Sequence, residues 1–173
     1  GSIRAKNVKN ILLKSVLDAC LGGLVWYLVG YGVAYGGDSP IIGLAGAGYT
    51  LSGVIDTGAT HEHGYDWVSF FFQYCFCAAC ATIVSGAVAE RTQLGAYLAY
   101  CVVIIGFIYP VVVHWVWDSA GFLCAWNPNA MMGGMVDFAG SGVVHMTGGW
   151  AAMVGAKVVG PRLGRFEKGI PDA

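Results

Sequence analysis

The chain has 173 residues, of which 57% are hydrophobic and only 11% are charged, and its formal net charge is −1. Soluble domains carry about 25% charged side chains. This composition, with a mean hydropathy of +0.64, excludes an ordinary soluble domain and indicates a membrane protein. The nearly balanced charge gives no sign of a nucleic-acid partner, and none is expected.

Four windows without Asp, Glu, Lys or Arg are each long enough for the roughly 20 residues that cross a bilayer. They are Ala19–Gly37, Trp67–Ala89, Thr92–Trp117 and Phe138–Ala156. We therefore expect an all-α, polytopic membrane protein that forms one domain over residues 1–173. Its transmembrane helices are predicted at about residues 11–36, 67–89, 94–117 and 138–159.

The basic residues all fall on one predicted side of the membrane. They are Arg4, Lys6, Lys9, Lys14, Arg91, Lys157, Arg162, Arg165 and Lys168. Because cytoplasmic loops retain Lys and Arg, both ends of the chain are predicted to lie inside, and the loops 37–66 and 118–137 to face outward. The chain starts without an initiating Met, and we expect it to be part of a longer protein.

The cysteines and one histidine cluster give only weak signals for a metal or a disulfide. Cys75, Cys77 and Cys80 fall within the second predicted span, where thiols commonly behave as small apolar groups. The segment His61–His63 offers three ligands on a predicted loop, without the fourth that a zinc site needs. No metal and no other cofactor are therefore predicted.

The first predicted span carries two charged residues and several glycines. Lys14 and Asp18 lie one turn apart near its inner end, and an i, i+4 ion pair lowers the cost of placing each charge there. Gly22 and Gly30 leave room for neighbouring helices to approach closely. We interpret these residues as structural.

Aromatic residues mark the second and third predicted spans. Phe72 and Phe76 share one helical face, and Phe76 lies nearly three turns into its span, below the usual aromatic belt. His114 and Trp117 lie near the outer end of the third span, beyond a kink expected at Pro110. They form either an interfacial Trp with a hydrogen-bonded His or a ligand vestibule, and both interpretations are open.

The fourth predicted span begins at Asp137, a residue type that caps helix starts. His145 lies over two turns inside an uncharged stretch, where an ionisable group is costly and indicates a functional pathway. Gly149, Ala152 and Ala156 follow it at helical spacing, so we expect this face to pack against other helices. A core histidine and a pore histidine are both open interpretations.

Several long stretches of the chain carry a family resemblance. They are GSIRAKN and NILLKSVLDA before the first span, FFFQYCF and SGAVAERTQ in the second, YPVVVHWVW in the third, and DFAGSGVVHMTGGWAAMVGAKVVGPRLGRF in the fourth. Together they resemble the ammonium transporter, methylammonium permease and Rhesus family, especially its eukaryotic ammonium transporters. The resemblance implies that this chain holds four spans of the first half of an inverted-repeat fold.

The resemblance assigns Phe76 and Trp117 to an outer site where ammonium is held against aromatic faces, and Phe72 with Phe76 to a gate. A small cation gains about 0.5 to 2 kcal/mol over such rings. Asp137 matches the aspartate beside this site, with an architectural and an electrostatic role both open. His145 matches the first of two pore histidines, whose imidazoles can donate and accept protons.

The implied activity is transmembrane transport of ammonium, and also of methylammonium, rather than enzymatic catalysis. Because an apolar constriction disfavours an ion, ammonium is expected to lose a proton before ammonia passes. The resemblance also implies a homotrimer in the lipid bilayer, and we expect the plasma membrane.

The alternative function within the family is an ammonium sensor with little transport. A haem protein ligated by His114 and His145 is disfavoured, because the two residues lie at different depths. Lys157 departs from the family pattern, since its position is usually apolar there.

Overall fold

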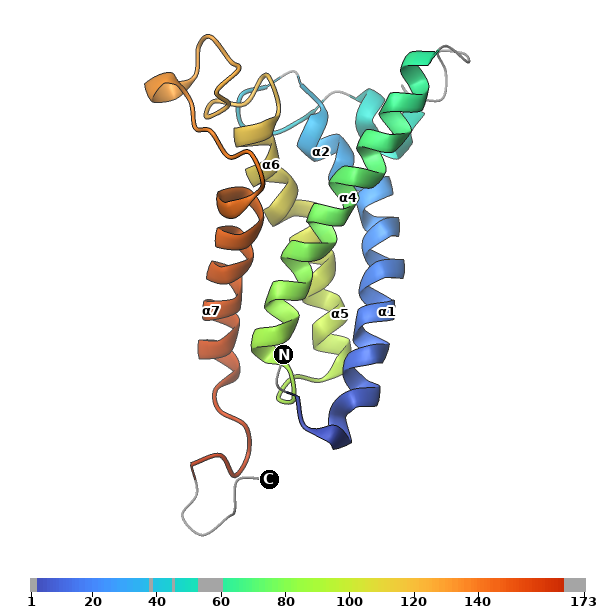
Figure 1. The fold of residues 1–173 in the computed structure, drawn as a ribbon, viewed down its shortest axis with the longest axis vertical. Helices are drawn as coiled ribbons and strands as arrows, with labels where there is room; N and C mark the ends of the chain where they lie inside the picture. Colours follow the sequence, from blue (N-terminus) through green and yellow to red (C-terminus); the bar gives the residue numbers. More distant parts are fainter. Residues whose placement is uncertain (1–2, 38, 45, 53–60, 167–173) are drawn as a thin grey trace.

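The computed structural model describes residues 3–37, 39–44, 46–52 and 61–166, without the side chains of residues 46–48 and 61–66. The described chain is helical, and its long helices run along the long axis of the molecule (Figure 1). It contains no β-strand among these residues, only an isolated bridge between Cys124 and Met135. The side chains of His61–His63 lie outside the described residues, and the backbone of this segment begins a helix, α4 (His61–Val88), instead of the predicted loop.

The first helical rod is continuous from residue 5 to residue 35. It consists of the short 3-10 helix η1 (Ala5–Asn7), α1 (Val8–Val25), the π-helical turn η2 (Trp26–Gly30) and α2 (Tyr31–Tyr35). A 3-10 segment, η3 (Gly46–Leu51), follows in the first long connection. Tyr49 of η3 donates a hydrogen bond from its hydroxyl to the Gly43 carbonyl, and its ring lies against Gly32 of α2.

The second and third rods form an antiparallel pair joined by a tight turn. They consist of α4 (His61–Val88), and of α5 (Leu94–Val103), the π-helical turn η4 (Ile104–Ile108) and α6 (Tyr109–Trp117). Pro110 lies in the first turn of α6. Because proline has no N–H to continue the regular pattern, the expected distortion takes the form of the π-helical turn that precedes it.

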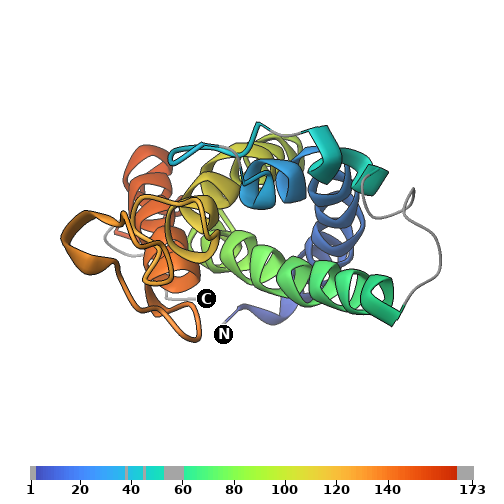
Figure 2. The same ribbon diagram turned by 90° about the horizontal axis from the view of Figure 1, so that it is seen from above.

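The last rod contains the π-helical turn η6 (Ser141–Met146) and α7 (Thr147–Val159). The connection between α6 and α7 includes the short 3-10 helix η5 (Met131–Gly133). Seen from above, this connection lies beside the start of the last rod (Figure 2). The end of the molecule with this connection is called the outer end, and the end with the α4–α5 turn the inner end, following the predicted sidedness.

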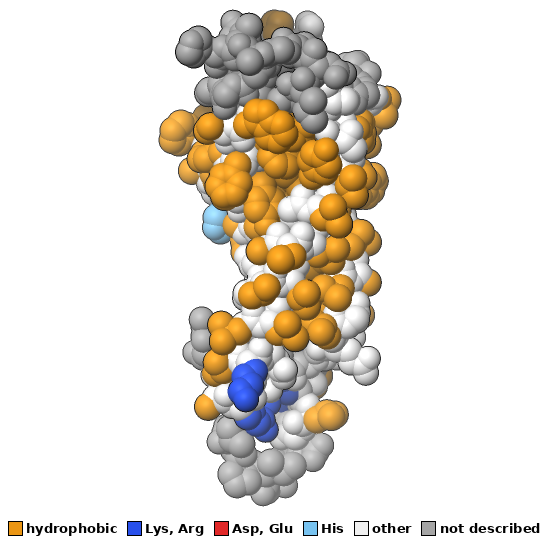
Figure 3. All heavy atoms as spheres, turned by 90° about the vertical axis from the view of Figure 1, so that its right-hand side faces the viewer, with side chains coloured by type: hydrophobic (Ala, Val, Ile, Leu, Met, Phe, Trp, Pro, Cys, Tyr) orange, Lys and Arg blue, Asp and Glu red, His pale blue; other side chains and the backbone are white. Residues whose placement is uncertain are grey.

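Three helical segments among the described residues are long and apolar enough to cross a membrane: Ala5–Tyr35, Trp67–Val88 and Leu94–Trp117. The all-α membrane-protein prediction is confirmed. The expected number of four spans is corrected, since Ser141–Val159 is not among these segments. Its glycines, together with His145 and Lys157, lower its hydropathy. Hydrophobic side chains cover the middle of the visible face, whereas Lys and Arg gather near one end (Figure 3).

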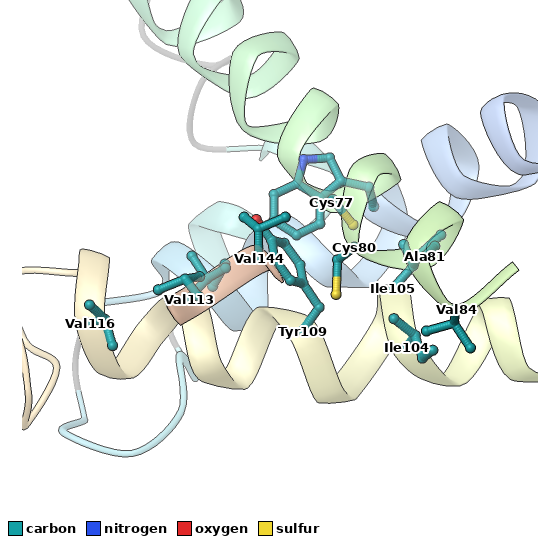
Figure 4. Packing of buried hydrophobic residues seen from close by; sticks show 13 residues of the cluster. Cys77, Cys80, Ala81, Val84, Ile104, Ile105, Tyr109, Val113, Val116 and Val144 are labelled. Atoms are coloured by element: carbon teal, nitrogen blue, oxygen red, sulfur yellow. The ribbon is translucent and has the colours of Figure 1, made fainter. Parts of the chain in front are cut away.

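The buried core lies where η2, α4, η4, α6 and η6 meet (Figure 4). Trp26 and Tyr109 are fully buried there, with ring centroids 6.0 Å apart. Cys77 and Cys80 are free thiols with no exposed surface, as expected for cysteines that pack as apolar groups. Gly30 permits the close approach of the first and third rods, because an added Cβ would lie 2.7 Å from the Ile105 carbonyl oxygen.

The last rod packs on α4 through a different face from the one predicted. A Cβ at Gly148 would lie 3.0 Å from the Cys80 carbonyl oxygen, and one at Gly155 would lie 3.3 Å from Val88. His145 is exposed, and a Cβ at Gly149 would meet nothing within 4 Å. His145 and Gly149 at the start of the predicted face are therefore uncovered among the described residues, whereas Ala152 and Ala156 further along it are half-buried. The pattern of small residues alone was ambiguous, because small residues occur on both faces of α7.

The predicted pairing of Lys14 with Asp18 is only part of what the structure shows, because the two charges interact electrostatically but no salt bridge joins them. Both side chains are buried, but each has its own partner on α5. The Lys14 ammonium lies 4.7 Å from the centroid of the Tyr97 ring. Asp18 accepts hydrogen bonds from the Tyr97 hydroxyl and, at 3.0 Å, from the Cys101 thiol. The two charges therefore join the first and third rods instead of bonding within one helix.

Candidate functional site

A pocket of about 240 Å³ lies near the outer end, between α2, α4, α6 and the connection that follows α6. Four of the predicted site residues line it together, namely Phe72, Phe76, Trp117 and Asp137. They come from positions up to 65 residues apart in the chain (137 − 72). The structure therefore brings together the residues that the sequence analysis assigned to cation recruitment and gating.

Three aromatic rings form a connected series along one wall of this pocket. The ring centroids of Phe72 and Phe76 are 5.0 Å apart with an interplanar angle of 84°, because the two residues are one turn apart on α4. The centroids of Phe76 and Trp117 are 5.5 Å apart at 69°. Both contacts are edge-to-face, the favoured geometry for aromatic quadrupoles. Such rings offer negative faces to a cation.

The indole of Trp117 is held in place by the backbone of the next element. Its Nε1–H donates a 2.7 Å hydrogen bond to the backbone carbonyl oxygen of Asp137. Trp117 is the last residue of α6, and the chain extends at Asp118. The hydrogen bond therefore ties the end of α6 to the start of the last rod.

The carboxylate of Asp137 accepts four hydrogen bonds from backbone amides at the start of η6. Oδ1 accepts from Gly140 and Ser141, both at 3.0 Å, and Oδ2 accepts from Gly142 at 3.0 Å and Val143 at 2.7 Å. These are amides that a helix start leaves without intrahelical partners. Gly140 has φ of +83°, which lets the chain turn tightly enough to aim the amides at one carboxylate. Asp137 thus caps the amides of the last rod as predicted, but it lies before the N-cap residue Gly140, and the helical segment begins at Ser141 rather than directly after Asp137.

The charge of Asp137 is balanced by no cationic side chain of the pocket wall. Its hydrogen-bond partners are neutral amides, and the described lining includes no Lys or Arg. The negative charge therefore contributes a favourable potential for a cation in the pocket, although both oxygens are already engaged. The architectural and the electrostatic roles are compatible in this geometry.

Two polar residues of the pocket were not predicted as site residues. Gln73 on α4 and Tyr35 on α2 both line the pocket. The Gln73 Oε1 atom and the Tyr35 hydroxyl are buried and have no hydrogen-bond partner among the described residues. The carboxamide within the aromatic stretch FFFQYCF was the available signal for Gln73. Tyr35 gave no signal of its own, because its approach to the pocket depends on helix packing.

His145 lies in η6, beyond this pocket. Its Nδ1 atom is 3.1 Å from the Gly140 carbonyl oxygen. Because a carbonyl can only accept, Nδ1 is the donor, and a neutral imidazole then leaves the lone pair of Nε2 available. The tautomer is thus set by a backbone group of the same turn that Asp137 caps.

His114 is fully buried and does not line the pocket. Its Nδ1 lies 3.0 Å from the Ala34 carbonyl oxygen and its Nε2 lies 2.6 Å from the Ser39 carbonyl oxygen. Both nitrogens are occupied by the backbone, so this geometry argues against His114 as a haem ligand. Of the two open interpretations, the hydrogen-bonded histidine describes His114, whereas Trp117 belongs to the pocket.

The fold and the pocket define a class of protein, namely helical membrane proteins with an aromatic pocket suited to a small cation. Comparison with known sequences identifies the family. A family model described as "Ammonium Transporter Family" matches residues 1–172. The chain belongs to the ammonium transporter family and is an integral membrane protein.

Curated plant proteins are similar over nearly the whole chain. It is 47% identical over 172 residues to ammonium transporter 1 member 1 of Arabidopsis thaliana, covering 98% of this chain and 33% of that protein. It is 46% identical over 168 residues to ammonium transporter 1 member 3 of Solanum lycopersicum, covering 96% of this chain and 35% of that protein. The chain therefore spans about a third of the length of these relatives.

A solved structure supports the same fold. The chain superposes on a protein named "Sensor Amt Protein" with a TM-score of 0.77 and 31% sequence identity. The match covers 95% of this chain and 39% of the solved chain. The helical arrangement described above is thus found in an experimentally solved relative.

Proposed function

We propose that the complete protein to which this chain belongs transports ammonium across a membrane. The observation that carries the proposal is the outer pocket, in which Phe76 and Trp117 make edge contact beside the amide-bound carboxylate of Asp137. Family membership supports the choice of ammonium as the cation. The two plant relatives described above are named ammonium transporters.

Recruitment of ammonium follows from the chemistry of the pocket wall. A small cation gains about 0.5 to 2 kcal/mol over an aromatic face, more as water is removed. The unpartnered Oε1 of Gln73 offers a neutral acceptor for an N–H of ammonium. Since the Asp137 oxygens already accept four amides, the carboxylate attracts the ion without forming a tight ion pair that would trap it.

Passage beyond the pocket then depends on loss of a proton. Moving an ion into apolar surroundings without compensating partners is far more costly than moving neutral ammonia. In this proposal Phe72 and Phe76 form the gate at the constriction. The Nε2 atom of His145 faces a pore completed by residues outside this chain, and it accepts or donates a proton along that pore.

An uptake assay tests the recruitment role. The complete gene product is placed in cells that lack their own ammonium uptake, and growth and uptake are measured at low ammonium. The Phe76→Ala, Trp117→Ala double variant should take up ammonium at least about tenfold more slowly at limiting concentration, because two cation–π contacts are lost. Phe71→Ala is the matched control, since Phe71 is exposed on the same helix and does not line the pocket.

Normal uptake by the double variant would overturn the recruitment role. The sensor function predicted as the alternative is separated by a parallel signalling readout. If the protein is a sensor with little transport, the wild-type protein should give a normal signal but should not restore growth at low ammonium. The sensor name belongs to a relative at 31% identity, whereas the transporter names belong to relatives at 46% and 47% identity, and we therefore favour transport.

We also propose that the complete protein forms a homotrimer in the plasma membrane and accepts methylammonium. The resemblance to the family supports these proposals. Native mass spectrometry of the purified protein, fluorescence microscopy of a tagged protein and uptake of labelled methylammonium test them separately. A monomeric or dimeric mass, an internal-membrane location or absence of methylammonium uptake would contradict the corresponding proposal.

A further inference from the structure

A second pocket lies at the inner end, opposite to the aromatic pocket. We propose that it binds a phosphomonoester anion, carried either by a membrane lipid or by free phosphate. Its volume is about 570 Å³, and it lies between the α4–α5 turn, the end of α7 and the segment that follows α7. Its basic lining residues are Arg91, Lys157, Arg162 and Arg165, and its only acidic lining residue among the described residues is Glu90.

The charge of Glu90 is already satisfied inside the protein. Its carboxylate accepts hydrogen bonds from the Asn7 amide at 2.6 Å, from the Arg4 backbone N–H at 3.1 Å and from the Arg4 side chain at 3.2 Å. The Arg162 guanidinium donates to the other carboxylate oxygen. Glu90 therefore neutralises the arginine charges that it contacts directly, whereas Arg91 and Lys157 form no ion pair with a carboxylate of the described residues.

Arg91 carries a positive charge that forms no ion pair with a carboxylate of the described residues. Its Nη1 donates to the Gly160 carbonyl oxygen at 2.7 Å and its Nε donates to the Ala87 carbonyl oxygen at 3.2 Å. Carbonyl oxygens satisfy hydrogen bonds but carry no net charge. The backbone thus holds the Arg91 guanidinium at the pocket wall while its charge remains available to an anion.

Lys157 adds a second positive charge from the last turn of α7. The side chain is exposed and forms no ion pair with any other described residue. The proposed ammonium pathway does not use it. Lys157 lines the same pocket as Arg91, and together they give the pocket an excess of positive charge suited to a doubly charged phosphate.

The location of the pocket suits a phosphate at the membrane surface. Helix α4 ends at Val88 and α7 ends at Val159, so the pocket lies level with the ends of these helices. Exposed apolar residues lie beside the basic ones, among them Leu163 and Phe166. Basic pockets between transmembrane helices on the cytoplasmic side are suited to anionic lipid head groups, and free phosphate offers the same chemistry.

Binding is tested on the complete gene product purified in detergent. Isothermal titration calorimetry measures the affinity for dioctanoyl phosphatidic acid, dioctanoyl phosphatidylcholine and inorganic phosphate. Phosphatidic acid should bind at least about fivefold more tightly than phosphatidylcholine, and Lys157→Gln should weaken its binding about fivefold, as expected for one basic residue near the membrane surface. Lys9→Gln is the matched control. It removes the same positive charge at the inner end of the molecule, but Lys9 does not line this pocket.

Each outcome decides between the proposal and its rejection. Equal affinities for the two lipids, or an unchanged affinity in folded Lys157→Gln, would overturn it. Competition by inorganic phosphate supports the proposal and identifies free phosphate as a ligand, whereas binding of phosphatidic acid without such competition assigns the site to a lipid. Because Lys157 is exposed, the melting temperature of the variant should match that of Lys9→Gln. The binding test does not measure ammonium uptake, so its result is independent of whether the proposed transport function is correct.

Discussion

The two ends of the molecule each place one carboxylate at the junction of its helices, but they surround it differently. At the outer end, Asp137 accepts four neutral backbone amides. At the inner end, Glu90 accepts from Asn7 and from the charged side chains of Arg4 and Arg162. The outer carboxylate therefore keeps its negative potential, whereas the inner one is neutralised within a basic region.

This difference shows how similar helix junctions produce opposite electrostatic environments. A carboxylate satisfied by amides can both stabilise a turn and attract a cation, as proposed for the aromatic pocket. A carboxylate satisfied by arginines gives stability to the inner turn but leaves Arg91 and Lys157 to set the local charge. The outer end is thus suited to a cation and the inner end to an anion.

The largest expected effect comes from changing the outer carboxylate. In Asp137→Asn, an NH₂ group would face two backbone N–H donors that now bond to a carboxylate oxygen. Leaving such donors without an acceptor should lower the free energy of unfolding by about 3 kcal/mol. The thermal unfolding midpoint of the complete protein in detergent measures this loss.

Asp118→Asn is the control for this experiment. Asp118 is also buried near the outer end, but its Oδ1 accepts from one amide, that of Ala120, at 2.7 Å. Its Oδ2 also lies 3.9 Å from Nδ1 of the buried His114. An asparagine can keep the hydrogen bond from Ala120 and loses only the charge, so the loss of stability should be smaller than that of Asp137→Asn. If the two variants lost equal stability, the special role of the four-amide cap would be refuted.

The next largest effect concerns the contact between α4 and α7, which connects the two ends. In Gly148→Ala, the new Cβ would lie 3.0 Å from the Cys80 carbonyl oxygen and 3.1 Å from the Ile83 Cβ. Overpacking of this kind should lower the free energy of unfolding by about 1 to 3 kcal/mol. Gly149→Ala should be tolerated, because its Cβ would meet nothing within 4 Å. Thermal unfolding of both variants tests this prediction. A larger loss of stability in Gly149→Ala than in Gly148→Ala would contradict it.

The smallest expected effect comes from the inner carboxylate and depends on pH. The hydrogen bond from Asn7, with those from Arg4 and Arg162, lowers the pKa of Glu90 from 4.5 to about 2. Since the pKa is lower in the folded state, the ionised carboxylate stabilises the fold above about pH 4.5, and this contribution disappears as the pH falls toward 2. Glu90→Gln should therefore have a lower unfolding midpoint than the wild type near pH 7.

The difference between wild type and Glu90→Gln should shrink between about pH 4.5 and pH 2, which thermal unfolding at several pH values can follow. A difference that stays constant over this range would show that the ionised form of Glu90 gives no stability.

Sequence patterns predicted the helical rods, and the resemblance to the transporter family assigned most of the residues of the aromatic pocket. Charge-free windows located the first three spans because a bilayer tolerates few charges. The one-turn spacing of Phe72 and Phe76 predicted that they share a helical face. The two rings make an edge-to-face contact because of this spacing. Asp137 was recognised as a cap from its residue type, but its four amide partners became visible only with the tight turn at Gly140.

The sequence-based predictions were wrong where a helix could contact more than one neighbouring helix. Lys14 and Asp18 have the spacing of an ion pair, yet α5 offers the Tyr97 ring and hydroxyl as competing partners. In the last rod, small residues occur on two faces, and only the position of α4 selects Gly148 and Gly155 for the contact. Local spacing does not contain this information.

The sequence by itself determined that this is a helical membrane protein, which residue types form its aromatic site, and that its basic residues gather at one end. The membrane class and the distribution of charge follow from composition and periodicity, which act along a single segment, whereas the aromatic site residues were assigned by the resemblance to the transporter family. Only the tertiary structure decided which helix faces meet, that Tyr35 and Gln73 join the outer pocket, and that Arg91 and Lys157 line one inner pocket. The reason is physical: contacts between distant segments depend on the rotation and depth of each helix, and several arrangements satisfy the same local pattern.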